Sequence, residues 1–328
     1  MSFETLTFVF WGYGSEDVLA PLRAHLEAQG LECLAWPDPS LSPAEEVAFL
    51  RARPFVLLTS AHFLRDQEIL ARISPGVRIG ASPVELIREC RPVASIFYPH
   101  DLGTPLVLVE PQVLPSAFDL VLWPTPHYGY SPPPPRFENV GWIGFHKGSE
   151  ADREAAAGGR TWLFSDFEHH RKTLGVERTF AKLEPILRRD VAIKFPLWPG
   201  HREWEEHFAA QGVRVIPAER NSFGVMLGSS LVLSNGVSGV TFEAVYAGVP
   251  VLNLAESYLR PGLQREFLGA LRGCRIVSYE DAPDALSKPP PAPPRQIEPF
   301  DFDRALRAIR EVCEARLQRA RALGAQRQ

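Results

Sequence analysis

Short apolar runs recur along the chain, separated by longer segments in which apolar and polar positions are mixed. Each run spans three to six residues without strict alternation, which is typical of strands buried on both faces. The runs in the first half are Thr5–Phe10, Leu31–Trp36, Pro54–Leu58, Val93–Tyr98, Leu106–Val109, Phe118–Trp123 and Val140–Phe145. Those in the second half are Thr161–Ser165, Val191–Phe195, Val213–Ile216, Leu231–Leu233, Val249–Leu254 and Arg275–Ser278. This repetition predicts an α/β chain with parallel sheets.

The segments between the runs carry helix start and stop signals. Ser15 precedes a predicted helix over Glu16–Gln29, and Gly30 follows it as a C-terminal glycine. Ser42–Glu45 and Ser82–Glu85 both read Ser-Pro-x-Glu, a capping box with proline at the first helical position. The other predicted helices are Val176–Leu187, Arg202–Ala210, a short one near Ser222, Thr241–Tyr246, Arg265–Leu271 and Asp301–Leu323.

Length and composition favour two domains. The chain has 328 residues, of which 45% are hydrophobic, enough for two buried cores. The polar segment Lys147–Arg160 and the proline-rich segment Ser287–Arg295 both read as connectors. We predict a Rossmann-like acceptor domain over residues 1–150 and a Rossmann-like nucleotide-donor domain over residues 151–290. Residues 291–328 then form a proline-rich connector and a terminal helix.

Charge and cysteine usage exclude several classes of function. A net charge of −4 gives no reason to expect nucleic acid binding. The four cysteines are far apart in sequence, so neither a disulfide framework nor a zinc site is expected. No apolar run reaches the roughly 18 residues of a transmembrane helix, and no leader-like segment is visible. A cytoplasmic location is therefore the expectation.

The segment Leu231–Leu254 carries the strongest candidate for chemistry. It reads as a strand, a loop of small residues over Ser234–Gly239, a helix and a second strand. Glycines let a ligand approach the backbone, and the N–H groups of the following helix favour phosphate. The predicted contacts are Ser234, Asn235, Gly236, Ser238, Gly239 and Thr241, with Glu243 placed to reach a ribose diol. The alternative is an ordinary tight turn in which Glu243 only complements the helix dipole.

The same segment resembles a known motif. Ser238–Ala244 reads Ser-Gly-Val-Thr-Phe-Glu-Ala and is followed by Gly248-Val249-Pro250. This is similar to the donor-nucleotide motif of the GT-B glycosyltransferases, the UDP-N-acetylglucosamine 2-epimerases and the CDP-glycerol glycerophosphotransferases. The resemblance implies two Rossmann-like domains facing a cleft, with a terminal helix that crosses back onto the N-terminal domain. It also implies a UDP- or CDP-linked donor held in the second domain without a metal or other cofactor.

The first loop of the chain carries two glycines, Gly12 and Gly14. A third glycine at the spacing of the dinucleotide fingerprint is missing, so NAD binding is not expected. We retain Gly12 and Gly14 as candidate contacts to the donor.

His100 and Asp101 follow the apolar run Val93–Tyr98. Ligands of open α/β sheets bind at the carboxyl ends of the strands, and His is a suitable base near neutral pH. His100–Pro105 resembles a stretched form of the His-Gly-Thr-Pro motif of the glycerophosphotransferases, with two residues inserted. The prediction is that His100 is the catalytic base and that Asp101 orients it. The alternative is a loop histidine that caps a turn.

Two further sites are candidates for holding a diphosphate. His169–Gly175 is predicted to be a basic loop after the run Thr161–Ser165, and it resembles the His-Arg-Arg-Glu-Asn-Leu-Gly element of the 2-epimerases without its acid. His170 and Arg171 are its candidate contacts. Lys194 ends an apolar run where the related families carry a Lys-x-His-Pro element, of which only the lysine remains here. The alternatives are a solvated basic face and an edge lysine.

No metal site is predicted. The adjacent histidines at His169 have no third ligand at suitable spacing, and Asp301-Phe302-Asp303 is best explained by Asp301 or Asp303 acting as a helix N-cap.

The sequence favours a GT-B-type transferase that moves a sugar or polyol phosphate from a nucleotide donor to an unidentified acceptor, for example a cell-envelope glycan or polyol. Two alternatives remain open. One is a nucleotide-sugar 2-epimerase, and the other is a non-catalytic protein of GT-B shape that binds a nucleotide or acts as a scaffold.

Overall fold

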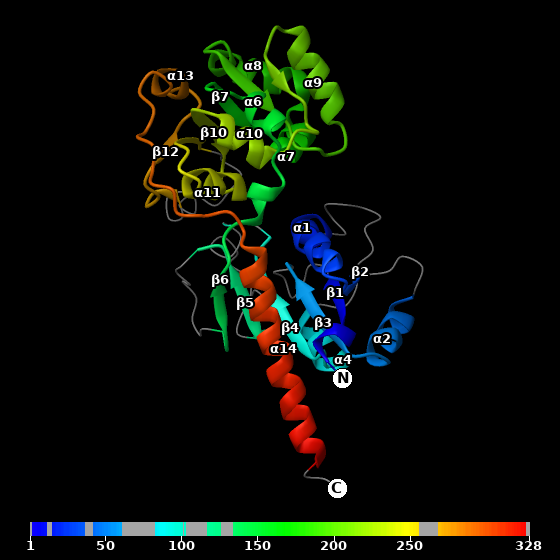
Figure 1. The fold of residues 1–328 in the computed structure, drawn as a ribbon. Coiled ribbons are helices and arrows are strands. Elements are labelled where there is room, and N and C mark those ends of the chain that lie inside the picture. Colours follow the sequence, from blue (N-terminus) through cyan, green and yellow to red (C-terminus); the bar gives the residue numbers. More distant parts are fainter. Residues whose placement is uncertain are drawn as a thin grey trace. The chain divides into compact units, whose positions relative to one another are not determined.

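The computed structural model forms two compact α/β units, and each is described by itself (Figure 1). The structure describes residues 2–11, 15–36, 42–60, 83–100, 102, 117–125, 134–255 and 268–325. Among these, the first unit takes the residues up to His100, those from 117 to Ile143 and those from Glu298 onward. The second unit is built mainly from Gly144–Ile297.

The first unit contains a six-stranded parallel sheet in the order β2-β1-β3-β4-β5-β6. Its strands are β1 (Thr7–Trp11), β2 (Glu32–Trp36), β3 (Phe55–Thr59), β4 (Ala94–Phe97), β5 (Leu120–Trp123) and β6 (Phe137–Asn139). Strands β1, β3, β4 and β5 are buried along their whole length, as their continuous apolar runs predict.

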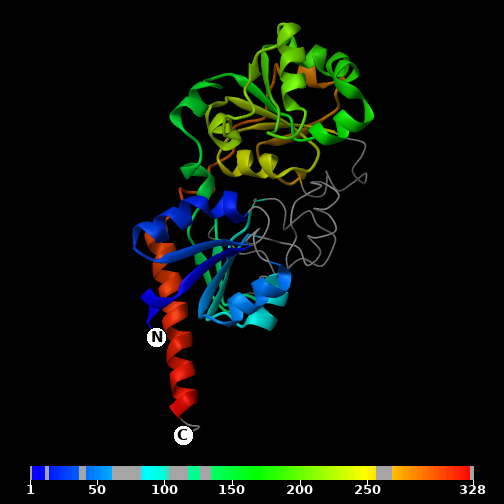
Figure 2. The ribbon, with the colours of Figure 1, turned by 90° about the vertical axis from the view of Figure 1, so that its right-hand side faces the viewer.

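Helices cover both faces of this sheet. Helix α2 (Pro43–Arg51) and helix α4 (Pro83–Cys90) pack against each other and against the side chains of Val9 and Leu57. Helix α1 (Ser15–Ala28) and helix α14 (Phe302–Ala325) lie together on the opposite face (Figure 2). The Ser42 capping box is confirmed at the start of α2, whereas the one predicted at Ser82 lies outside the described residues.

The terminal helix belongs to the first unit although it follows the second unit in sequence. Before it begins, the Trp142 N–H donates to the Glu298 carbonyl at 2.7 Å, and the Asp301 N–H donates to the Val140 carbonyl at 2.7 Å. The Asp301 carboxylate accepts from the Arg304 N–H at 2.9 Å, which confirms its role as a cap. Helix α14 then runs along β4 and β5. The prediction of a helix that crosses back to the N-terminal unit is confirmed.

The return of the chain requires a glycine at position 141. Gly141 has φ of +80°, and a Cβ there would lie 2.4 Å from the Pro299 carbonyl oxygen. The predicted strand Val140–Phe145 is wrong for this reason. The chain bends at Gly141 and enters a 3₁₀ turn, η3 (Ile143–His146), while the last strand of the sheet is β6.

The second unit contains a second six-stranded parallel sheet, in the order β12-β11-β10-β7-β8-β9. Its strands are β7 (Arg160–Leu163), β8 (Val191–Lys194), β9 (Val215–Ile216), β10 (Leu231–Asn235), β11 (Val251–Leu254) and β12 (Cys274–Val277). Its helices are α6 (Glu150–Glu154), α7 (Phe167–Thr173), α8 (Gly175–Leu187), α9 (His201–Ala210), α10 (Ser222–Gly228), α11 (Gly239–Tyr246) and α13 (Ala282–Ala285).

The core of the second unit is rich in aromatic side chains. Phe164, Phe167, Phe195, Trp204 and Phe208 are buried, with ring centroids 5.0–6.5 Å apart; most pairs meet edge to face or tilted, and Trp204 and Phe208 are stacked. Helices α8, α9 and α13 pack on this side, whereas α10 contacts both α6 and α11 on the other side. The rigid sheet therefore fixes the loops at its carboxyl edge, where β7, β8 and β10 end side by side.

Candidate functional site

The loop from β10 to α11 is shaped by a buried network of three polar side chains. The Asn253 amide donates to Ser234 Oγ at 2.9 Å, to Thr241 Oγ1 at 3.2 Å and to the Gly236 carbonyl at 2.7 Å. The two hydroxyls lie 2.8 Å apart, and all three side chains are fully buried. Ser234 and Thr241 therefore hold the loop through internal bonds, and their contact with a ligand stays a prediction.

The neighbouring Asn235 fixes the other side of the same loop. Its Oδ1 accepts from Trp162 Nε1 at 2.7 Å, and its Nδ2 donates to the Tyr279 hydroxyl at 2.7 Å. Its carbonyl accepts from Ser165 Oγ at 3.2 Å. Since Asn235 is 1% exposed, its side chain also serves the loop's own structure. Trp162, Ser165 and Tyr279 were not predicted to support this loop, because they lie far from it in sequence.

The backbone that follows is the part of the loop left open to a ligand. Gly236 has φ of +54°, which turns the chain away from the sheet, and residues 237–240 are half-buried. Helix α11 begins at Gly239 after Ser238, whose side chain makes no capping bond. The first N–H groups of a helix have no partner within the helix and attract anions. Glu243 lies half-buried one turn further on, and its contact with a ribose stays a prediction.

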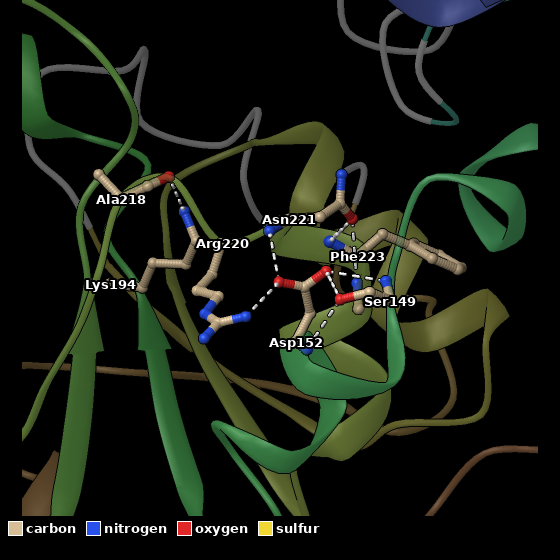
Figure 3. Close-up of polar contacts among 8 residues, drawn as sticks. Ser149, Asp152, Lys194, Ala218, Arg220, Asn221 and Phe223 are labelled. Atoms are coloured by element: carbon tan, nitrogen blue, oxygen red, sulfur yellow. Dashed lines mark hydrogen bonds and ion pairs between the residues drawn. The ribbon is translucent and has the colours of Figure 1, made fainter. Parts of the chain in front are cut away.

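A second structured loop, between β9 and α10, lies at the same edge of this sheet (Figure 3). Asp152, at the start of α6, accepts from the Ser149 N–H at 2.8 Å and from the Asn221 N–H at 3.2 Å. Arg220 lies 3.8 Å from the same carboxylate. Burial alone would raise the pKa of Asp152, but the bonds from Ser149 and Asn221, with the Arg220 guanidinium, hold that pKa below its usual value.

The same loop caps helix α10. Asn221 Oδ1 accepts from the Phe223 N–H at 3.0 Å and from the Gly224 N–H at 3.1 Å. Sequence reasoning missed both Asp152 and Asn221, although each had a visible signal. Ser149 and Asp152 have the spacing of a capping box, and Asn221 directly precedes the short apolar helix.

Lys194 lies beneath this loop. Its side chain is 3% exposed, and its Nζ donates to the Ala218 carbonyl at 3.0 Å and to the Phe195 carbonyl at 3.2 Å (Figure 3). Burial lowers the pKa of the ammonium to about 8, against the opposing effect of Glu205 and other nearby carboxylates. Lys194 thus ties together the loops after β8 and β9, and its predicted contact with a phosphate is not tested.

The predicted basic loop after β7 is a helix. Residues Phe167–Thr173 form α7, so the interpretation of His169–Lys172 as loop residues is wrong. The His170 ring is fully buried, with Nδ1 3.1 Å from the Asp166 carboxylate and carbonyl, and it does not face solvent. Arg171 is exposed and forms two bonds to Glu168, at 2.9 and 2.8 Å.

His100 lies in the first unit, after the carboxyl end of β4, and is half-buried. This is the strand end at which it was predicted, and its role as a base stays a prediction. Asp101, Gly12 and Gly14 lie outside the described residues.

An open depression of about 490 Å³ in the second unit is lined by Glu150, Arg153, Glu154, Ala157, Gly158 and Gly228. Gly158 precedes β7, and Gly228 lies shortly before β10. The depression therefore lies at the amino edge of the sheet, opposite the loops described above, and is not part of the candidate site.

Within the described ranges, no group of three or more His, Cys, Asp or Glu side chains is arranged to hold a metal ion. No helix in the described part of the chain is both long and apolar enough to span a membrane.

The fold was compared with solved structures. The spinosyn forosaminyltransferase SpnP aligns over 99% of this chain and 100% of its own, with a TM-score of 0.53 and 13% sequence identity. Together with the two six-stranded parallel sheets, that alignment shows the architecture. The chain has a GT-B-type fold.

Other GT-B-type neighbours are more distant. The UDP-GlcNAc 2-epimerase of Methanocaldococcus jannaschii, in complex with UDP-GlcNAc and UDP, aligns over 93% of this chain and 99% of its own. Its TM-score is 0.47 and its identity is 13%, so it adds no argument about function. No family model matches the chain, and no curated protein matches it. The GT-B-type fold is thus shown by structure, and the chemistry has to be argued from the site.

Proposed function

We propose that this chain is a GT-B-type transferase that moves a sugar or polyol phosphate from a nucleotide-activated donor, UDP- or CDP-linked, to an acceptor. The loop from β10 to α11 supports this most directly. The Ser234 and Thr241 side chains of this segment hydrogen-bond to other groups of the protein, whereas the backbone of the loop leads into the N-terminus of α11. Since many functions share one fold, the fold alone does not carry the proposal.

The donor's diphosphate would lie against Ser238, Gly239 and the first N–H groups of α11. The three-residue network of Ser234, Thr241 and Asn253 fixes these groups before the ligand arrives, so little ordering is left to be done on binding. Glu243, on the same helix, would accept hydrogen bonds from the ribose diol. Arg171, on the neighbouring α7, is exposed and would bind the diphosphate by giving up its ion pair with Glu168.

In this mechanism His100 deprotonates the acceptor, and fixed dipoles stabilise the charge that develops on the leaving diphosphate. In this proposal no step is assigned to a metal.

The alternative of a binding protein without turnover has one observation in its favour. Two residues predicted to hold phosphate, His170 and Lys194, are buried and bonded to the chain itself. The alternative of a 2-epimerase differs from the transferase because it needs no acceptor and alters the donor sugar itself. Incubation with UDP- and CDP-linked sugars separates the three: a transferase releases nucleotide when an acceptor is present, an epimerase changes the sugar, and a scaffold does neither.

The donor site itself is tested by calorimetry of UDP and CDP binding. We expect Glu243→Ala to weaken binding by roughly 1.5–3 kcal/mol, the worth of a hydrogen bond to a charged group. The matched control is Glu298→Ala, which removes an acidic side chain of the other unit and should leave the affinity for UDP and CDP unchanged. Equal affinities of the Glu243→Ala variant and the wild type would refute the ribose assignment.

A further inference from the structure

The chain passes between the two units at residues 140–145 and again at residues 295–301, and these two crossovers are bonded to each other. The first leaves the first unit after Ile143, and the second re-enters that unit at Glu298. The Trp142 N–H of the first crossover donates to the Glu298 carbonyl of the second at 2.7 Å. A displacement of one crossover is therefore carried to the other.

In the second unit, the crossovers are bonded to the end of the helix that begins at the candidate donor loop. The N–H groups of Gln296 and Ile297 donate to the carbonyl of Tyr246, the last residue of α11, at 2.7 and 3.3 Å. Arg295 Nε donates to the Ile297 carbonyl at 2.8 Å, and its guanidinium lies 4.6 Å over the ring of Phe145 in the first crossover. The position of α11 is thus linked to that of both crossovers.

In the first unit, the crossovers are bonded to Tyr98, which directly follows β4 and is fully buried. Its hydroxyl donates to the Gly141 carbonyl at 3.1 Å and accepts from the Ile143 N–H at 2.9 Å. Its ring stacks on Trp142 with the centroids 5.8 Å apart, and it meets Phe300 of the second crossover edge to face at 5.4 Å. One side chain therefore holds both crossovers.

Tyr98 is also connected stiffly to His100. Its N–H donates to the Thr59 carbonyl of β3 at 3.0 Å, so its backbone still belongs to the sheet. Pro99 alone separates it from His100, and a proline fixes its own φ and restricts the residue before it. The bonds of the Tyr98 hydroxyl therefore act on the point from which His100 leaves the sheet.

We propose that Tyr98 is a positioning residue, whose hydroxyl transmits the position of the crossovers, and with it that of α11, to His100. A donor bound at the first N–H groups of α11 thereby acts on the base, although the two lie in different units. The role of His100 as the base rests on the proposed function. The coupling itself rests on the bonds of the crossovers and can be measured without any ligand.

The test is a double-mutant cycle on the full chain without nucleotide, read at the imidazole of His100 by NMR of protein labelled at its histidines. The signal is assigned by its absence in His100→Ala. Arg295→Ala, in the second unit, removes the bond to the Ile297 carbonyl and should shift the His100 signal. Tyr98→Phe keeps the ring and loses the hydroxyl, and in that background Arg295→Ala should shift the signal far less.

Two further variants are matched controls. Tyr246→Phe also removes a tyrosine hydroxyl but keeps the carbonyl that bonds the crossover, so in that background Arg295→Ala should shift the His100 signal as it does in the wild type. Arg272→Ala removes an exposed arginine of the second unit and should leave the His100 signal in place.

Two outcomes would overturn the coupling. One is an unmoved His100 signal in Arg295→Ala, which decides the question even if Tyr98→Phe does not fold. The other is an equal shift with and without the Tyr98 hydroxyl. UDP and CDP calorimetry of the wild type keeps this inference apart from the proposed function. Nucleotide binding with an unmoved His100 signal in Arg295→Ala refutes the coupling alone, whereas absent nucleotide binding refutes the donor site and leaves the coupling to be decided by the cycle.

Discussion

The buried position of Lys194 in the second unit can be tested directly, because a buried ammonium makes the free energy of unfolding depend on pH. The ammonium is 3% exposed and bonds two carbonyls, and its pKa is lowered from 10.5 to about 8. Between these two values the unfolded chain keeps a proton that the folded chain has released. Stability therefore rises with pH across this window, and the penalty for burying the charge is fully present below pH 8. At 1.36 kcal/mol per pKa unit, the whole effect is about 3 kcal/mol.

The perturbation is Lys194→Met, which keeps most of the side-chain length and removes the titrating group. Urea unfolding followed by tryptophan fluorescence at pH 7, 8.5 and 10 gives the free energy of unfolding of each variant. We expect the wild type to gain about 2–3 kcal/mol relative to Lys194→Met between pH 7 and pH 10. The wild type and Lys194→Met contain the same buried cysteines and tyrosines, so the titration of these groups cancels in the difference between the two free energies of unfolding. Lys288→Met, at an exposed lysine, should follow the wild type. Parallel pH profiles for Lys194→Met and the wild type would refute the reasoning.

Three further predictions concern the loop, the base and the metal. Asn253→Ala should lower the free energy of unfolding, measured by urea unfolding, by about 1–3 kcal/mol, because Ser234 and Thr241 lose their buried hydrogen-bond donor. An unchanged free energy of unfolding would show that the network is not needed for stability. His100→Ala should reduce turnover by about 10²–10⁴-fold with little change in nucleotide affinity, and full turnover in that variant would move the base to another residue. Turnover should survive EDTA, and strict dependence on a divalent ion would contradict the metal-free mechanism.

The two sheets could be predicted from sequence because burial dictates their pattern. Strands such as β3 and β10 lie inside the sheet, are buried throughout and begin with continuous apolar runs, so length and composition suffice to find them. The error at Val140–Phe145 has a different cause. That run is equally apolar, but Gly141 meets the Pro299 backbone, and the contact is between residues far apart in sequence. The local pattern of apolar and polar residues cannot predict a contact between residues so far apart in sequence.

The candidate site was predictable in its backbone and less so in its side chains. The loop after β10 and helix α11 lie at the positions predicted from Ser238 and Gly239. The hydroxyls of Ser234 and Thr241 looked like ligand donors, but their partner Asn253 lies on the next strand and engages both. His170 was misjudged for a similar reason, because Asp166 one turn earlier and the ring of Phe164 enclose it. Burial of a polar residue depends on neighbours that spacing alone does not reveal.

The return of helix α14 to the first sheet has a consequence for the order of folding during synthesis. Nearly all of the second unit is one continuous stretch, Gly144–Ile297, so its core is complete as soon as that stretch has left the ribosome. The first unit is made earlier but lacks the helix that covers β4 and β5 until Phe302–Ala325 has been translated. We therefore expect the later unit to reach its native state first. Until then, the apolar face of β4 and β5 is exposed on the growing chain, and it is the surface on which a chaperone would act.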